Sequence, residues 1–359
     1  MNIEILTSEQ AETLLEWYVA NARDLPWRHT KDPYRIWVSE IMLQQTRVAA
    51  VIDRYQSFLS ALPDIQSLAL CKADRLNKLW EGMGYYSRVR NMQKCAQVLM
   101  DQYHGEFPAD AALLQKLPGI GPYTAGAIAS FAFNLPVSAI DGNVLRVLAR
   151  LQKDRSDIRL PQTRNAYADK LDHFIEMSAQ NSIGFPSVFN QAIMELGALV
   201  CLPGNKAECA DCPMHVTCPV HASDLCAEIP YRSKNAERRV ICRTLLIIKD
   251  STRFLLHRRK NSGLLAGLYE WIGIDAFITP EQAIEEAERM GLVPLRIHRL
   301  EDSRHIFTHL EWHMHAFEIQ VAQIDRLQLP DCILASRKEL KELAIPSAFH
   351  TYTDYYDIR

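Results

Sequence analysis

The chain of 359 residues contains no run of eighteen consecutive apolar residues, so its sequence predicts no membrane-spanning helix. Its first residues carry acidic side chains early and hold no apolar core bounded by a cleavage site, which argues against a secretory signal. We therefore expect a protein that stays inside the cell, in the cytoplasm.

Basic residues are not in excess either, since 40 lysines and arginines stand against 43 aspartates and glutamates. The net charge of −3 gives no sign of a nucleic-acid partner, so DNA binding would require a local basic surface. No G-x-G-x-x-G segment opens a helix, which leaves no sequence evidence for a flavin or nicotinamide partner. The length and the 48% of hydrophobic residues suit roughly two domains.

Apolar residues recur at helical spacing over most of residues 1–228, without an alternating strand pattern. We expect helices at 34–43, 47–62, 66–79, 87–103, 110–117, 123–133, 143–152, 162–178 and 186–200. The polar and basic stretch that follows predicts a linker at 229–238. Beyond it, alternation predicts strands at 240–249, 252–260, 294–300 and 313–321, with a helix at 280–292. The predicted fold is multidomain, an all-α region at 1–228 followed by a smaller α+β domain at 239–359.

Nine cysteines in an intracellular protein are not expected to form a disulfide framework. Five of them are scattered and are interpreted as small buried apolar residues, namely Cys71, Cys95, Cys226, Cys242 and Cys332. The other four lie in CLPGNKAECADCPMHVTC with the spacing C-x7-C-x2-C-x5-C, namely Cys201, Cys209, Cys212 and Cys218. Four thiolates suit zinc or an iron–sulfur cluster. Zinc ribbons usually have two C-x2-C pairs, so the single pair in the loop 201–218 favours a [4Fe–4S] cluster.

The segment LPGIGPYTAGAI predicts two helices joined by a tight turn, a helix-hairpin-helix over 110–133. Gly119 and Gly121 permit a close backbone, and Pro122 suits the first position of the second helix. The exposed amides of such a turn can bind a DNA phosphate without reading the base sequence. The alternative is an ordinary helix–helix turn.

Two carboxylates are candidates for catalysis. Glu40 shares a helix face with Trp37 and Leu43, and a carboxyl group on an apolar face has a raised pKa, which suits a general acid. The alternative places Glu40 at the edge of that stripe, in solvent or paired with an arginine. Asp141 precedes the helix DGNVLRVLAR, where it can cap the helix, face a developing positive charge, or do both, with Asn143 to orient it.

The segments SEIMLQQT, GMGYYSRVRN, LPGIGPYTAGAI, DGNVLRVLAR, NQAIMELGALVC and the cysteine cluster occur in this order. Over the whole chain they resemble the MutY-type adenine DNA glycosylases, which belong to the helix-hairpin-helix glycosylases related to endonuclease III. The resemblance implies a two-lobed catalytic region with a [4Fe–4S] cluster and a Nudix-like C-terminal domain. One departure is the first cysteine gap, which is usually six residues in that family and is seven here.

The implied reaction is base-excision repair, the hydrolysis of the N-glycosidic bond of adenine mispaired with 8-oxoguanine or guanine in duplex DNA. The implied catalytic residues are Glu40, Asp141, Tyr123 and Asn143, and those of the adenine pocket are Trp27, Arg28, Leu43 and Glu195. DNA contacts are implied for Gln45, Thr46, Tyr85, Gly119, Gly121 and Lys206, and 8-oxoguanine recognition for Phe307, Thr308 and His309. The resembling enzyme would act as a monomer, associated with the nucleoid through its DNA.

Bifunctional members of the superfamily carry a lysine in the hairpin, where this chain has Tyr123, so we expect a monofunctional glycosylase. The glutamates of 284–292 are out of register with a Nudix box, so no pyrophosphatase activity is expected. Three alternatives stay open: an endonuclease III-like glycosylase for oxidised pyrimidines, a non-catalytic DNA-lesion binder, and an iron–sulfur redox or regulatory protein. The missing lysine and the added domain count against the first, and the two carboxylates count against the second.

Overall fold

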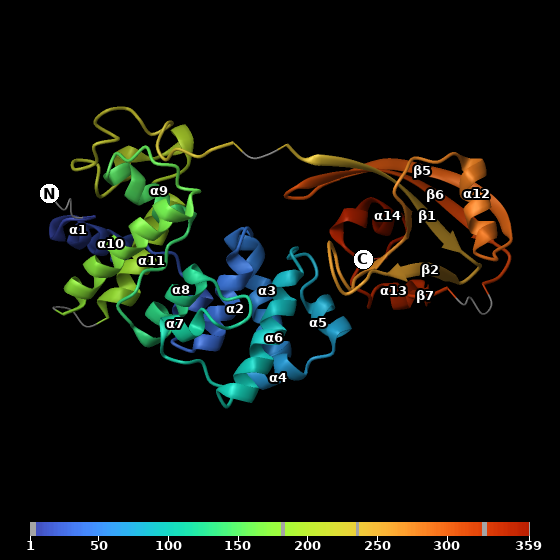
Figure 1. The fold of residues 1–359 in the computed structure, drawn as a ribbon, viewed down its shortest axis with the longest axis horizontal. Coiled ribbons are helices and arrows are strands. Elements are labelled where there is room, and N and C mark those ends of the chain that lie inside the picture. Colours follow the sequence, from blue (N-terminus) through green and yellow to red (C-terminus); the bar gives the residue numbers. More distant parts are fainter. Residues whose placement is uncertain (1–4, 181–183, 235–236, 325–328, 359) are drawn as a thin grey trace. The chain divides into compact units, whose positions relative to one another are not determined.

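A computed structural model describes residues 5–180, 184–234, 237–324 and 329–358 of the chain (Figure 1). The chain divides into two compact units, one of Met1–Leu70 with Asn91–Lys234 and one of Cys71–Arg90 with Asn235–Arg359. The division falls inside the predicted linker 229–238, of which residues 235–236 lie outside the described residues. It also groups Cys71–Arg90 with the C-terminal unit, a grouping that sequence analysis did not anticipate. Within the described residues, no helix has the length and apolar character needed to span a membrane.

Helices dominate the chain up to residue 199. The α-helices are α1 (Ser8–Asn21), α2 (Pro33–Leu43), α3 (Val48–Ala61), α4 (Ile65–Leu70), α5 (Ala73–Leu79), α6 (Ser87–Gln102), α7 (Ala111–Leu114), α8 (Pro122–Phe133), α9 (Gly142–Leu151), α10 (Pro161–Ala179) and α11 (Phe185–Leu199). The short 3-10 helices are η1 (Pro26–Arg28), η2 (Gly204–Lys206) and η3 (Cys209–Asp211).

Sequence analysis was wrong at two helix boundaries and missed α1. The single helix expected at 66–79 is two helices, because Lys72 adopts an extended backbone (ψ 139°) between α4 and α5. The helix expected at 110–117 ends at Leu114. A turn follows it, in which the Leu117 amide donates to the Leu114 carbonyl. Helix α1 begins with a capping box between Thr7 and Gln10.

Among the described residues of the first unit, two apolar clusters bring its helices together. Helices α1, α9, α10 and α11 pack around one cluster, whose fully buried members include Leu14, Leu148, Leu171, Phe189 and Leu196. Helices α2 and α8 share a second, smaller cluster. At Gly126 on α8 a Cβ atom would lie 2.0 Å from the Ser138 carbonyl oxygen, so only glycine allows this approach. The contact fixes the segment that leads from α8 into the start of α9.

Within the described residues of the second unit, seven strands form one sheet. The strands are β1 (Arg239–Lys249), β2 (Arg253–Arg258), β3 (Tyr269–Glu270), β4 (Ile272–Ile274), β5 (Pro294–Ile306), β6 (Leu310–Val321) and β7 (Cys332–Ser336). Their order is β3-β2-β1-β6-β5, with β4 paired to β1 and β7 paired to β2. Strands β1 and β6 are parallel, in register from Arg239↔Leu310 to Lys249↔Gln320, whereas β5 and β6 are antiparallel.

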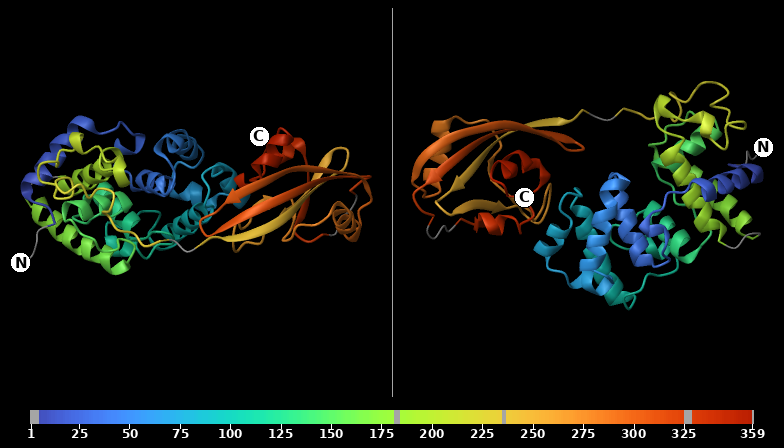
Figure 2. Two further views of the ribbon diagram at one scale, coloured as in Figure 1. Left: turned by 90° about the horizontal axis from the view of Figure 1, so that it is seen from above. Right: turned by 180° about the vertical axis from the view of Figure 1, so that it is seen from behind.

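Both faces of this sheet are covered. Helix α12 (Pro280–Arg289) buries Ala283 and Ala287 against one face. The C-terminal helices α13 (Arg337–Leu340) and α14 (His350–Tyr355), with η4 (Ser347–Phe349) between them, pack on the other face (Figures 1 and 2). The four strands and the helix expected here are confirmed, whereas the short strands β3, β4 and β7 were not predicted.

Candidate active site

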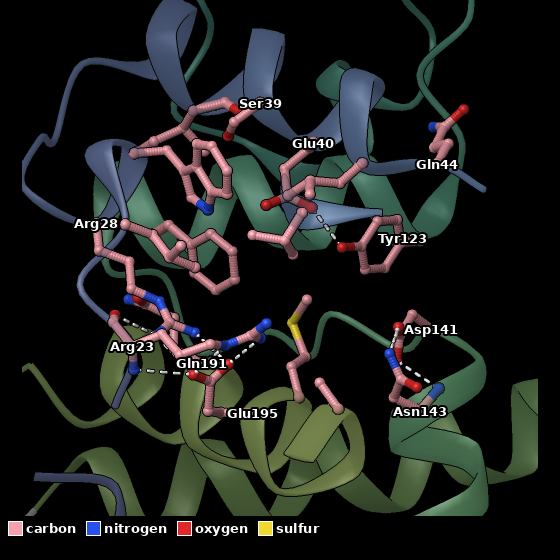
Figure 3. Close-up of a pocket in the computed structure, with 18 of the residues that line it drawn as sticks. Arg23, Arg28, Ser39, Glu40, Gln44, Tyr123, Asp141, Asn143, Gln191 and Glu195 are labelled. Carbon is pink, nitrogen blue, oxygen red and sulfur yellow. Dashed lines mark hydrogen bonds and ion pairs between the residues drawn. The ribbon is translucent and has the colours of Figure 1, made fainter. Parts of the chain in front are cut away.

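A cavity of about 620 Å³ opens in the first unit (Figure 3). Its walls come from η1, α2, α8, the start of α9 and α11, so segments far apart in the sequence meet here. Its volume falls in the range typical of pockets that bind a small molecule. The predicted catalytic residues that line it are Glu40, Tyr123, Asp141 and Asn143, and the predicted pocket residues are Trp27, Arg28, Leu43 and Glu195.

Glu40 lies on α2 and is 4% exposed, so the alternative that it reaches solvent at the stripe's edge is wrong. The Tyr123 hydroxyl on α8 donates a hydrogen bond to Oε2 of Glu40. Burial raises the pKa of Glu40 to about 7, an effect that the Asp141 charge reinforces and that Tyr123 and Arg28 oppose. A carboxyl group with this pKa is protonated in a large fraction of molecules near neutral pH and can donate a proton.

Tyr123 is half-buried, and desolvation of its hydroxyl together with the nearby carboxylates raises the pKa of this group well above the usual value. Its hydroxyl therefore stays protonated and acts as a hydrogen-bond donor at any working pH. The chain offers no amine at this position, which is the start of the second hairpin helix.

Asp141 is the N-cap of α9, as one reading of the sequence expected. Its Oδ1 accepts from the amides of Asn143 and Val144, each at 2.8 Å, and its Oδ2 accepts from the Asn143 side chain at 2.7 Å. Burial raises the pKa of Asp141, while these hydrogen bonds and Arg146 lower it. Burial outweighs these contacts, so the pKa of Asp141 lies above its ordinary value, while the three donors favour the ionised form and hold the carboxylate in one orientation.

Asn143 is held from two further directions. Nη2 of Arg146 donates to the Asn143 side-chain oxygen at 2.9 Å and to the Gly197 carbonyl at 2.7 Å. A Cβ atom on Gly197 of α11 would lie 2.7 Å from the Asn143 Cβ, so α11 and α9 touch here. The orientation of Asn143, and through it that of Asp141, is therefore fixed by packing.

Glu195 is the centre of a buried ion cluster at the other end of the cavity. Arg28 donates to both Glu195 oxygens at 3.0 and 2.7 Å, and Arg23 donates to both at 2.8 and 2.7 Å. Burial alone would raise the pKa of Glu195, but the two arginines more than offset it and lower the pKa to about 2. The result is a rigid polar wall that stays ionised through the neutral range.

Sequence reasoning missed Arg23, Gln191 and Met194, which also line the cavity. Arg23 lies in a loop without periodicity, and 172 positions separate it from its partner Glu195. The other two were detectable, because residues 191, 194 and 195 stand three and four apart on α11 and therefore share one face.

The predicted DNA-contact residues occupy turns. Gln45 and Thr46 line the cavity on the turn after α2, and Gln45 has the unusual φ of 58°. In the hairpin, Gly119 has a φ of 78°, in the left-handed region. A Cβ atom added to Gly121 would meet no other atom within 4 Å. Lys206 is exposed at the end of η2. These positions fit the predicted contacts, which stay predictions.

In the second unit the lesion-reading candidates lie around the turn between β5 and β6. The Phe307 amide donates to the Leu310 carbonyl at 2.8 Å, and the Phe307 ring packs edge-on against Trp312 with centroids 4.8 Å apart. Thr308 and His309 are exposed at the tip of the turn. The hydroxyl oxygens of Thr308 and Tyr85 are 2.9 Å apart, and Tyr85 has φ 45°. The structure thus brings together a residue predicted to contact DNA and one predicted to recognise 8-oxoguanine.

A second, small cavity lies beside α9 in the first unit. Among its described lining residues are the four predicted ligands and, in addition, Cys226. The interpretation of Cys226 as a buried apolar residue is therefore wrong, because it is half-buried and faces the same cavity. Of the other scattered cysteines, Cys95 is buried as expected, Cys71 and Cys332 are half-buried, and Cys242 is exposed, contrary to expectation.

The donor set fits an iron–sulfur cluster. Nη1 of Arg150 lies 3.2 Å from Sγ of Cys201, the kind of charge-assisted donor that stabilises a thiolate ligand. Over the described residues, no three His, Cys, Asp or Glu side chains gather closely enough to hold a single metal ion. Cysteine side chains that border one shared cavity are the donor type that an iron–sulfur cluster uses.

Comparisons with known proteins agree with this fold. The family profile of the HhH-GPD superfamily base excision DNA repair proteins matches residues 38–171, and the NUDIX domain profile matches residues 243–355. The fold class expected from the sequence, an all-α helix-hairpin-helix region followed by a smaller Nudix-like α+β domain, is therefore confirmed. The structure of a thermostable thymine-DNA glycosylase is similar over 59% of this chain and 95% of that chain, with a TM-score of 0.53 and 26% identity.

Similarity to curated proteins extends over both units. The adenine DNA glycosylase of Buchnera aphidicola subsp. Baizongia pistaciae (strain Bp) is 34% identical over 317 residues, which cover 87% of this chain and 86% of that protein. The adenine DNA glycosylase of Mus musculus is 32% identical over 370 residues, which cover 86% of this chain and 70% of that protein.

Proposed function

The chain belongs to the family of adenine DNA glycosylases, and on that premise we propose that it releases adenine from opposite 8-oxoguanine or guanine in duplex DNA. It is a hydrolase of N-glycosyl bonds that acts in base-excision repair. The observation that most supports adenine release is the one cavity that holds both Glu40, with a pKa of about 7, and the capped carboxylate of Asp141. A base in a duplex is reached only after it leaves the stack, and the cavity would receive the extruded adenine.

In the proposed reaction Glu40 is the general acid. Adenine leaves poorly as an anion, so a proton delivered to its ring nitrogen N7 lowers the barrier to bond cleavage. The raised pKa keeps Glu40 protonated at a pH where an ordinary glutamate would be ionised. The Tyr123 hydroxyl orients the Glu40 carboxyl group through its hydrogen bond.

Asp141 is proposed to stabilise the sugar. Departure of the base leaves an oxocarbenium-like cation, and a carboxylate on its face can stabilise that charge or bond to it transiently, as in glycoside hydrolases. The amide donors at the α9 N-terminus and the Asn143 side chain favour the ionised form of this carboxylate and align it. Tyr123 stands where a bifunctional enzyme would need an amine, which supports hydrolysis without strand cleavage.

The pocket walls would select and position the base. Trp27 is buried and packs edge-on against Tyr55, which gives a rigid aromatic surface. Arg28 is held by Glu195, so its guanidinium presents donors in a fixed direction. Leu43 completes an apolar border at the end of α2. We propose that these side chains bind adenine before the chemical step.

The residues at the second cavity fit a [4Fe–4S] cluster, which Cys201, Cys209, Cys212 and Cys218 would hold. When bound, the cluster would cross-link the loop 201–218 at four points and so support its shape. Arg150 and Arg146 already tie this loop to α9, because they donate to the Leu202 and Cys201 carbonyls. We propose that exposed Lys206 contacts a DNA phosphate from this loop.

Recognition of 8-oxoguanine is proposed for the second unit. The pair of Tyr85 and Thr308 supports it, because an aromatic ring and a hydroxyl donor stand side by side with exposed atoms. An aromatic side chain can replace the stacking that a lesion loses, and the Thr308 hydroxyl can exchange its present partner for a base edge. Phe307 and His309 flank this hydroxyl in the chain. Substituting Thr308→Val should reduce the preference for adenine opposite 8-oxoguanine over adenine opposite guanine without abolishing release.

The chemistry is tested by single-turnover release of free adenine from a duplex with adenine opposite 8-oxoguanine. Asp141→Asn should lower the rate by about two orders of magnitude or more, because the amide cannot stabilise a cation. Asp53→Asn is the matched control, since Asp53 is an exposed carboxylate on the outer side of α3. Equal rates for the Asp141→Asn variant and the native protein would rule out the proposed role of this carboxylate.

A further inference from the structure

The cavity of the predicted cluster ligands contains a fifth thiol. Sγ of Cys226 lies 3.6 Å from Sγ of Cys209, a direct sulfur–sulfur contact. Both sulfurs border the cavity that Cys201, Cys212 and Cys218 also line. A four-iron cluster has four iron corners for protein ligands. The described residues therefore place five thiols around this cavity, two of them in contact with each other.

The position of Cys226 is built into the fold. Arg150 of α9 is 2% exposed, and its guanidinium donates to the Cys226 carbonyl at 2.7 Å and the Ile229 carbonyl at 2.8 Å. The same guanidinium donates to Sγ of Cys201 at 3.2 Å. One buried side chain thus joins the segment of Cys226 to the first predicted ligand, which limits the freedom of Cys226 to move away.

The path of the chain after Cys218 returns Cys226 to the cavity. The Leu225 amide donates to the Val220 carbonyl at 3.0 Å, and Val220 is fully buried. The Ile229 amide then donates to the Leu225 carbonyl at 3.0 Å, which closes the next turn. These turns return the chain to the cavity, which Cys226 lines.

We propose that Cys226 is an alternative cluster ligand, so that the corner assigned to Cys209 can be held by either thiol. Metal–thiolate bonds are about 2.3 Å long, and sulfurs in contact are within reach of one iron atom after small side-chain rotations. In the exchange, the bond from iron to the Cys209 sulfur breaks and one to the Cys226 sulfur forms. The proton of the Cys226 thiol passes to the Cys209 sulfur, and no electron is transferred. The inference rests on the proposed cluster and is independent of the proposed mispair.

The test is the iron and acid-labile sulfide content of the purified full chain, together with the electron paramagnetic resonance of the cluster. Cys209→Ser and Cys226→Ser should each keep about four irons per chain, because the other thiol completes the set. The double variant and Cys212→Ser should both lose iron, since neither keeps a spare thiol for the vacant corner. If Cys209→Ser loses iron as Cys212→Ser does, or if Cys226→Ser alone loses it, the proposal is wrong.

A second measurement uses the native protein and does not depend on the folding of any variant. Brief alkylation with iodoacetamide, followed by peptide mass analysis, should label Cys209 in some molecules and Cys226 in others, with the remaining three ligands protected. Exposed Cys242 is the internal control for reactivity, and buried Cys95 is the control for protection. Label on only one of the two thiols contradicts the exchange. A native protein that contains no iron contradicts the cluster itself, whereas its adenine release, measured separately, tests the proposed function.

Discussion

The raised pKa of Glu40 gives the sharpest prediction, that base release depends on pH in a defined way. If Glu40 must deliver a proton, the rate follows the fraction of protonated Glu40. With a pKa of about 7, that fraction is about one half at pH 7, about one tenth at pH 8 and about one hundredth at pH 9. The single-turnover rate should therefore fall about 50-fold between pH 7 and pH 9.

The contacts of Glu40 also predict how a substitution should shift the pH–rate profile of adenine release. A glutamate at its ordinary value of 4.5 would be protonated in only about 0.3% of molecules at pH 7, so burial raises the active fraction by roughly a hundredfold. The Tyr123 hydrogen bond lowers the pKa of Glu40, so its loss in Tyr123→Phe should raise that pKa further. The alkaline limb of the profile should then shift to higher pH, whatever happens to the maximal rate.

The assay is single-turnover release of adenine, with duplex and enzyme concentrations chosen so that binding is saturated at each pH. Asp53→Asn is the control, and the alkaline limb of its pH–rate profile should coincide with that of the native protein. A rate that stays level from pH 7 to pH 9 would refute Glu40 as the acid. Glu40 would also be refuted as the acid if Tyr123→Phe left the alkaline limb of the pH–rate profile in place or moved it to lower pH.

Three further predictions follow from contacts in the first unit. Gly121→Ala should weaken DNA binding at least several-fold, measured by titration of a labelled duplex, with an unchanged melting temperature, because its Cβ would enter open space at the proposed phosphate site. Gly197→Ala should slow adenine release about tenfold or more, because the added Cβ would lie 2.7 Å from the Cβ of Asn143 and displace that side chain. Release at the native rate would show that the close packing of Gly197 on Asn143 is not critical. Glu195→Gln should cost about 3 kcal/mol of unfolding free energy by leaving two arginines without a counter-charge. The pKa of Glu195, about 2, lies below its ordinary value of 4.5, so this stabilisation is complete above about pH 4.5 and is lost as the pH falls toward 2. Thermal melts of the native protein and the variant should therefore show a difference in melting temperature that shrinks across this pH range.

Much of the site was predictable where function coincides with a local pattern. The apolar stripe of α2 marked Glu40, the glycine-rich turn marked the hairpin, and the residue before α9 marked Asp141. Their convergence was not predictable from spacing, because 101 positions separate the two carboxylates. Only the resemblance to a known family placed them in one pocket before the structure did.

The features that sequence analysis missed lack such a pattern. Strands β3 and β4 have two and three residues, too few to show alternation. The break before α5 carries neither glycine nor proline, so nothing in the sequence marks it. Arg23 acts through a distant partner, and Cys226 stands outside any C-x2-C pair, so both became visible only when the fold returned them to a site.

The central claim, adenine release directed by the opposite base, is tested most directly with the native protein and three duplexes. Adenine would be placed opposite 8-oxoguanine, guanine and thymine, and single-turnover release of the free base would be measured for each. We predict fast release from the first, slow release from the second and none from the third. Equal release from all three would contradict selection by the opposite base, and tight binding without release from any of them would contradict the proposed chemistry.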